Sequence, residues 1–343
     1  MARKGYENYD PNGVGVANGN FLGLPRVEDA AVDFRAIPFA PTVSYGTGTA
    51  GGPANVLAAS YQLDVCLPGL DRPWELGFDW YEIDAPQIAQ QPALRTIAER
   101  HIARLENGSA ADGGTDLAAV NEAGEQLAIW IYGEVSGSLA AGRFPVLIGG
   151  SHATALGAYW ALPEDCGILQ IDAHMDLREA YEGFAYSHAS VMYNMLRTTA
   201  RSTRPSLVQV GIRDYCPAEQ QLARESERVT TFYDVDLQRA KLSGEAFAKT
   251  CGPIIAALPN RTWISLDIDG LDPSLCPNTG TPVPGGLSFA EALYLCRAVI
   301  ESGREVIGMD IVEVAGAPHE YEGAVAARLG YEVSARAVTA KRQ

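Results

Sequence analysis

Short apolar segments alternate with longer amphipathic segments along most of the chain. Five short segments are almost continuously apolar and end in polar residues: 144–148, 167–171, 207–210, 263–266 and 305–309. An apolar run without alternation is typical of a strand that is buried on both faces, as in a parallel sheet. The pattern predicts five such strands, and residues 34–39 are a candidate for a short first strand.

Segments with helical spacing lie between these strands. Apolar residues recur every three or four positions in 92–106 and 117–139, and shorter helical patterns cover 54–60, 154–162, 190–198 and 288–302. Asp116 is placed to cap the second long helix. Strands that alternate with helices predict an α/β fold in which helices cover both faces of a central parallel sheet.

We expect one main domain, because the chain has neither an internal repeat nor an evident linker. Residues 1–33 are expected to form an irregular N-terminal arm, and residues 34–343 a single α/β domain. The glycine-rich segment 44–53 lacks the spacing of a phosphate-binding loop, so we expect a tight turn there. Loops such as 1–32 and 68–83 are expected to determine substrate selectivity.

All five strand ends carry His, Asp or Glu, and ligands bind at the carboxyl ends of parallel strands. The segment after 167–171 reads D-x-H-x-D, a spacing that places its three polar side chains on one side of an extended chain. A second D-x-D follows 263–266, and a histidine follows 144–148 behind two glycines. The candidate metal ligands are His152, Asp172, His174, Asp176, Asp267 and Asp269.

This set of donors indicates the kind of metal site. A structural zinc site uses Cys and His, whereas a carboxylate-rich set with some imidazole suits manganese and also accommodates iron, cobalt or nickel. Four carboxylates exceed the need of one divalent ion, so we expect two ions that share bridging carboxylates. Two ions about 3.5–4 Å apart can turn water into a nucleophile near neutral pH.

Composition narrows the partners. The 343 residues include 26 Lys and Arg against 42 Asp and Glu, a net charge of −16. This excess of negative charge argues against nucleic acid and against anionic membrane surfaces as binding partners. No segment approaches the roughly 18 apolar residues of a membrane helix, and no signal peptide is evident. The six cysteines are scattered, so we expect reduced thiols in a cytoplasmic protein.

The order of the motifs resembles that of the ureohydrolase family, which includes arginase and agmatinase. The resemblance rests on residues 149–152, 172–176, 265–273, 280–286, 310–313 and 326–329, and it extends from about residue 35 to the C-terminus. It implies a three-layer arginase-like fold and a dinuclear centre, usually of manganese; nickel is the alternative that the donor set leaves open. It also implies hydrolysis of a small cationic guanidino substrate to urea and an amine.

The resemblance also implies how the ligands are shared. One ion would be held by His152, Asp172, Asp176 and Asp267, and the other by Asp172, His174, Asp267 and Asp269. Asp172 and Asp267 would then bridge the two ions. Water activated between the ions would attack the guanidino carbon.

Further residues match the family's substrate and proton-transfer positions. Glu313 matches the carboxylate that pairs with the guanidinium, which is a favourable partner for a planar cation. His188 matches the histidine that carries a proton to the leaving amine. Asp176 is expected to act both as a metal ligand and as a catalytic residue. His101 lies on an apolar helical face and is interpreted as structural, whereas His319 is a candidate for the substrate mouth.

Three positions, in two motifs, depart from the family pattern. Ser151 stands where most members have Asp, Ala153 follows the ligand where they have Ser, and Asn278 stands where Gly is usual. Such neighbours tune metal sites, so metal choice or activity can differ. The segment 181–192 is more similar to agmatinase-type members than to arginases, and no match to the arginase loop for the amino-acid end of arginine is found.

Three functions remain open at this point. The first is an agmatinase-like guanidino hydrolase. The second is a hydrolase of guanidine, an alkylguanidine or a biguanide such as metformin, with nickel as its possible metal. The third is a weakly active or inactive subunit that supports a catalytic paralogue. The family resemblance suggests a homo-oligomer, a trimer or a hexamer, or a hetero-oligomer with such a paralogue.

Overall fold

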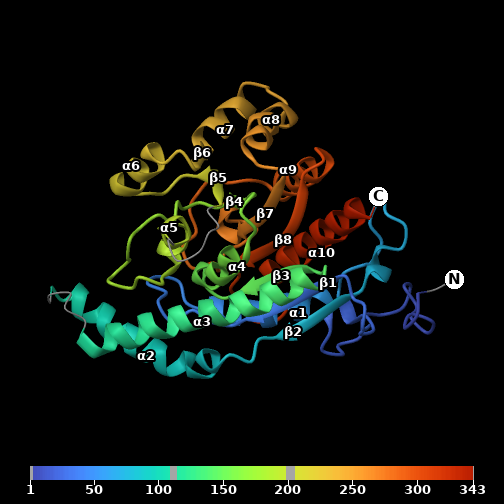
Figure 1. Ribbon diagram of the computed structural model, residues 1–343, viewed down its shortest axis with the longest axis horizontal. Helices are drawn as coiled ribbons and strands as arrows, with labels where there is room; N and C mark the ends of the chain where they lie inside the picture. The colour runs from blue at the N-terminus through green and yellow to red at the C-terminus, as the bar shows by residue number, and fades with distance from the viewer. Residues whose placement is uncertain (1–2, 109–113, 198–204, 343) are drawn as a thin grey trace.

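Eight parallel strands form one sheet through the centre of the molecule (Figure 1). The computed structural model describes residues 3–108, 114–197 and 205–342. The strands are β1 (Val32–Ile37), β2 (Phe78–Glu82), β3 (Phe144–Gly149), β4 (Cys166–Ile171), β5 (Ser206–Ile212), β6 (Val229–Tyr233), β7 (Arg261–Asp267) and β8 (Glu305–Val312). The predicted α/β fold with a parallel sheet is confirmed.

The order of the strands creates a switch point in the middle of the sheet. The order is β2-β1-β3-β8-β7-β4-β5-β6, which Figure 1 shows from β2 at the bottom to β6 at the top. Strands β3 and β4 are consecutive in the chain, yet β8 and β7 lie between them. Crevices at the carboxyl ends of strands form at such points. The topology therefore predicts a ligand site above β3, β8, β7 and β4.

Helices cover both faces of the sheet and enclose two apolar cores. One core includes residues of α2, α3, α4, α5 and α6, and the other includes residues of α1, α7, α8, α9 and α10. The helices are α1 (Gly52–Ser60), α2 (Pro86–Glu106), α3 (Gly114–Ala140), α4 (Leu156–Ala161), α5 (Val191–Arg197), α6 (Pro217–Glu225), α7 (Asp234–Leu242), α8 (Phe247–Ala257), α9 (Phe289–Glu301) and α10 (Tyr321–Lys341).

The predicted strands correspond to β1, β3, β4, β5, β7 and β8, and every residue of β3 and β4 is buried. The prediction missed β2 and β6, the two edge strands. Their sequences, FDWYE and VTTFY, mix polar with apolar residues. An edge strand has one neighbouring strand and is partly exposed, so it lacks the continuous apolar run that identifies a central strand.

The helix boundaries differ from the predicted ones at several points. Helix α2 begins at Pro86, six residues before the predicted start, and includes Pro92. Helix α3 begins at Gly114, so the expectation that Asp116 caps it is wrong. Asp116 lies in the first turn instead, where its carboxylate pairs with Arg100 and Arg104 of α2. The last residue of the predicted helix 190–198 lies outside the described residues.

The segment before β1 packs into the core. The ring of Phe21 stacks on that of Phe34 in β1, with 3.8 Å between the centroids, and both side chains are fully buried. The Asn20 side chain accepts a hydrogen bond from Trp80 N at 2.7 Å and donates one to Phe78 O at 3.0 Å. The segment therefore satisfies backbone groups of the edge strand β2.

None of the helices in the described ranges is both long and apolar enough to span a membrane. The six cysteines are unpaired thiols, and four of them are buried.

The role of the N-terminal segment can be tested at Phe21. We expect Phe21→Ala to lower the free energy of unfolding of the metal-free protein by about 3–5 kcal/mol, because it leaves a cavity beside Phe34. Urea denaturation followed by circular dichroism measures this change. Val14→Ala is the matched control in the same segment, since Val14 is 91% exposed. Equal stability of both variants would mean that the segment contributes no core packing.

Candidate metal centre

The predicted ligands meet at the carboxyl ends of β3, β4 and β7. His152 begins the short 3-10 helix η4 (His152–Ala155) after β3, and the D-x-H-x-D motif follows β4. Asp267 ends β7, and Asp269 lies in the next 3-10 helix, η6 (Ile268–Gly270). The centre therefore lies above the switch point of the sheet.

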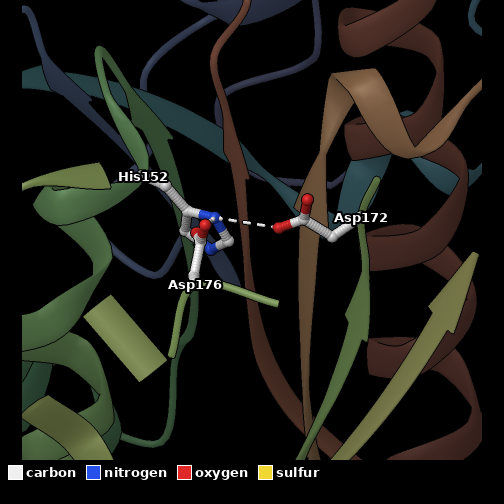
Figure 2. A group of neighbouring side chains, drawn as sticks. All are labelled: His152, Asp172 and Asp176. Atoms are coloured by element: carbon white, nitrogen blue, oxygen red, sulfur yellow. Dashed lines mark ion pairs between the residues drawn. The ribbon is translucent and has the colours of Figure 1, made fainter. Parts of the chain in front are cut away.

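His152 lies at the centre of one group of carboxylates (Figure 2). Its Nδ1 atom is 2.9 Å from Asp176 Oδ2 and 3.2 Å from Asp172 Oδ2, the two carboxylates drawn in Figure 2. The same atom is 3.4 Å from Asp267 Oδ2. All four side chains are buried. Within the described part of the chain, this Nδ1 atom has no hydrogen-bond partner. A buried nitrogen that faces three carboxylates without a hydrogen bond is a suitable donor for a cation.

His174 forms a second group that shares Asp172. Its Nδ1 atom is 3.1 Å from Asp269 Oδ2 and 3.7 Å from Asp172 Oδ1. The donor atoms of His174, Asp172 and Asp269 lie within 4.8 Å of one another, as do those of His152, Asp172 and Asp176. Two adjacent donor groups that share a carboxylate fit a pair of divalent ions.

Burial and the interactions among closely spaced charges dominate the electrostatics of the centre. Burial, reinforced by the charge of Asp172, raises the pKa of Asp176 to about 7. Burial and the charges of Asp269 and Asp172 hold the pKa of Asp267 well above its usual range. Burial alone would lower the pKa of His174, but the charges of Asp269 and Asp172 outweigh it and raise that pKa to about 12. Such a concentration of negative charge favours a bound cation.

Buried glutamines hold the first aspartate in place. Gln170 Nε2 donates a hydrogen bond of 2.7 Å to Asp172 Oδ2, and Gln209 Nε2 donates one of 2.8 Å to Gln170 Oε1. Neither glutamine was among the residues predicted for the site. A signal was available, because each is a polar residue inside an otherwise apolar buried strand.

A cavity of about 250 Å³ opens onto the centre, and His174, Asp176 and His188 line it. Tyr45 of the glycine-rich segment also lines this cavity, so the segment does more than form a turn. None of the described residues of 1–32 or 68–83 lines it. The expectation that those loops determine selectivity is therefore not supported by this cavity.

Glu313 lies against the His152 group. Its Oε1 atom accepts a hydrogen bond of 2.8 Å from the backbone nitrogen of His152. Burial raises the pKa of Glu313 to about 8. The backbones of Glu313 and Asp176 are left-handed, with φ of 57° and 55°, a conformation that non-glycine residues adopt at an energetic cost. Strain of this kind is concentrated at functional sites.

His188 faces the same cavity from the start of a short 3-10 helix, η5 (His188–Ser190). The backbone oxygen of Asp176 accepts hydrogen bonds from Met192 and Tyr193, which ties this segment to the centre. Burial, together with the positive charges of His174 and His152, lowers the pKa of His188 to about 4.

Four further residues that the sequence pointed to are not among the candidate ligands. His101 is buried, and its Nε2 atom is 2.8 Å from Glu182 O, as the structural interpretation expects. His319 is exposed and does not line the cavity. Ser151 is fully buried, and its hydroxyl has no hydrogen-bond partner among the described residues. Asn278 Nδ2 donates a hydrogen bond of 2.7 Å to Glu320 Oε2.

Comparison with known proteins places the chain in a family. The profile of the arginase family matches residues 30–338. An N(1)-aminopropylagmatine ureohydrolase of Thermus thermophilus is 32% identical over 307 residues, which are 89% of each chain. An agmatinase of Bacillus anthracis is 30% identical over 298 residues, 85% of this chain and 86% of that protein.

A solved structure shows the same fold. The proclavaminate amidino hydrolase of Streptomyces clavuligerus superposes with a TM-score of 0.70 at 21% identity, covering 94% of this chain and 97% of that one. The family profile extends over nearly the whole chain, including every strand and all six candidate ligands. This protein belongs to the arginase family.

Proposed function

We propose that this protein is a ureohydrolase of the agmatinase type, which hydrolyses a C–N bond of a linear guanidino compound and releases urea. The observation that carries the proposal is the pair of histidine–carboxylate groups that share Asp172 at the base of a cavity. The family membership and the names of the two relatives support the same reaction class.

The donor set supports two divalent metal ions. We assign His152, Asp172, Asp176 and Asp267 to one ion and Asp172, His174, Asp267 and Asp269 to the other. Four carboxylates and two imidazoles favour Mn²⁺, with Ni²⁺ as the alternative. Two such ions, when bound, activate water near neutral pH and stabilise developing negative charge.

The chain's own residues bind the substrate and move protons. Glu313 is buried beside the His152 group, and a guanidinium next to it would favour its ionised form, which is suited to pair with that planar cation. His188 lines the cavity, and its match to the family's proton-transfer histidine supports a role in passing a proton to the leaving amine. Asp176 links the two parts of the site, because it contacts His152 and also lines the cavity.

The cavity wall favours a substrate without a carboxylate tail. The arginine that lines it, Arg178, is 3.5 Å from the Glu219 carboxylate and lies over the ring of Tyr181. Asp214, which also lines the cavity, has a side chain that is 68% exposed. A carboxylate at the mouth attracts a cationic tail and repels the carboxylate of arginine. Agmatine-type substrates are therefore proposed over arginine.

We further propose a cytoplasmic oligomer. The unpaired thiols support a reducing compartment. The oligomer, a trimer or hexamer of this chain or an assembly with a paralogue, rests on the family resemblance.

Asp267→Asn tests the bridging carboxylate, since asparagine keeps the shape but removes the charge. We expect bound metal and urea release both to be lost, with kcat falling by more than the ~100-fold that loss of an outer-layer partner costs. Metal content by mass spectrometry and a urea assay measure the two effects. Asp272→Asn, an exposed aspartate in the same motif, should change neither. Retained activity would mean that the bridging role is wrong.

Glu313→Gln tests the substrate carboxylate. Glutamine can still accept the hydrogen bond from His152, so we expect metal content to stay unchanged. The value of kcat/KM should fall roughly 10- to 150-fold, because a hydrogen bond to a charged group contributes about 1.5–3 kcal/mol. Glu301→Gln, whose side chain is 69% exposed, is the control. Loss of metal instead of affinity for substrate would contradict the assignment.

A substrate panel tests the reaction itself. The protein is purified alone, its metals and oligomeric mass are measured, and urea or ammonia release is followed with agmatine, guanidinobutyrate, arginine, guanidine and metformin. We expect agmatine-type compounds to be hydrolysed fastest, chelation to abolish turnover and Mn²⁺ to restore it. Full metal occupancy without turnover of any compound would contradict the proposal and favour a supporting subunit. Adding a co-encoded paralogue would then test that alternative.

A further inference from the structure

A tyrosine hydroxyl lies behind the metal-facing histidine. Tyr159 of α4 is 1% exposed, and its hydroxyl oxygen is 3.2 Å from His152 Nε2. The same hydroxyl donates a hydrogen bond of 2.8 Å to Ser265 Oγ, which is itself 3.0 Å from His152 Nε2. Two hydroxyl groups therefore contact the ring nitrogen of His152 that faces away from the carboxylates.

The hydrogen bonds continue to a buried carboxylate. Asp310 is fully buried, and its Oδ1 atom accepts a hydrogen bond of 3.0 Å from Ser265 Oγ. Its Oδ2 atom accepts one of 2.6 Å from Trp263 Nε1. An indole nitrogen only donates and an ionised carboxylate only accepts, so these groups determine the direction of the remaining hydrogen bonds.

The directions of these hydrogen bonds determine the tautomer of His152. The Ser265 hydrogen is directed to Asp310, and the Tyr159 hydrogen is directed to Ser265. Both hydroxyl oxygens then face His152 Nε2 as acceptors, so this nitrogen carries a hydrogen. In a neutral imidazole the other nitrogen then has a lone pair. That nitrogen is Nδ1, which faces the carboxylates of Asp172, Asp176 and Asp267.

We propose that Tyr159 is a positioning residue that, with Ser265 and Asp310, holds His152 in the Nε2–H tautomer and thereby sets the affinity of the ion position that His152 serves. The inference rests on the proposed function, because it requires ions at the two donor groups. Hydrogen bonds to the second nitrogen of a ligating histidine commonly have this effect.

The two ion positions differ in this respect. His174 Nε2 is 4.0 Å from the nearest carboxylate oxygen of Asp214, which is beyond hydrogen-bond distance, and the His174 side chain is 24% exposed. No hydrogen-bond chain like that of His152 holds its tautomer within the described residues. Loss of the Tyr159 hydroxyl should therefore affect one ion position and not the other.

Loss of the Tyr159 hydroxyl removes one of the two oxygens that face His152 Nε2 as acceptors. Ser265 alone then favours the Nε2–H tautomer, so a larger fraction of His152 carries its hydrogen on Nδ1, where it blocks the lone pair that faces the carboxylates. Phenylalanine retains the ring and its packing, so Tyr159→Phe isolates the hydroxyl.

The experiment titrates the metal-free full-length protein with Mn²⁺ and follows free Mn²⁺ by electron paramagnetic resonance. For Tyr159→Phe we expect one of the two dissociation constants to rise by about 10- to 100-fold and the other to stay unchanged. Tyr331→Phe is the matched control, because Tyr331 is equally buried and its hydroxyl donates to Val65 O, a backbone acceptor remote from the centre. It should leave both constants unchanged.

The outcomes separate this inference from the proposed function. Wild-type protein that binds fewer than two ions would remove the proposed function and this inference with it. Wild-type protein that binds two ions, with unchanged constants in Tyr159→Phe, would overturn the inference alone. Equal weakening of both positions would also overturn it, because a general loss of structure would then account for the effect.

A second variant supports the test in case Tyr159→Phe does not fold. Ser265→Ala removes the group that accepts from Tyr159 and donates to Asp310. It should weaken the same single ion position. The free energy of unfolding of each metal-free variant, from urea denaturation, shows whether the change in affinity is separate from a change in stability. Unchanged ion affinity in a folded Ser265→Ala variant would overturn the inference.

Discussion

Crowding of negative charge at the carboxyl ends of the central strands is the constraint on which the rest of the site depends. Asp172, Asp176 and Asp267 all approach the same imidazole nitrogen, and all are removed from water. Burying ionised carboxylates is costly unless a positive charge compensates them. The raised pKa values of Asp176 and Asp267 express that cost. Divalent cations would relieve it, which is why this geometry supports a metal centre more strongly than a hydrogen-bonded cluster.

The fold concentrates these groups without strain in the strands themselves. The strands that precede the ligands and Glu313 are neighbours in the order β3-β8-β7-β4, although β3 lies far from β8 in the chain and β4 lies far from β7. The cost is confined to the segments just beyond the strands, where Asp176 and Glu313 adopt left-handed backbones. Behind them, buried polar side chains contact the candidate ligands: Gln170 contacts Asp172, and Tyr159 contacts His152. The strands and these hydrogen-bonded polar groups together fix the positions of the candidate metal-ligand side chains.

Much of this arrangement was predictable from local patterns. Central strands are buried on both faces, so they appear as apolar runs, and the D-x-H-x-D and D-x-D spacings identify donors that share one side. The edge strands β2 and β6 were missed because partial exposure removes that signal. The capping role of Asp116 was wrong, because ion pairs with α2 occupy its carboxylate and the helix begins earlier.

The sequence by itself determined the fold class, the family and the identity of the six candidate ligands, because each depends on the order of residues along single strands. Only the tertiary structure decided which side chains of the site contact one another. It placed Asp172 between His152 and His174, brought Tyr45 to the cavity and set Tyr159 behind His152. The contacts of His152 with Asp172 and Ser265, and the approach of Tyr45 to the cavity, join segments from different parts of the fold, and local spacing carries no information about them. The outer layer of the site therefore depends on topology and packing, whereas the donors themselves are encoded locally.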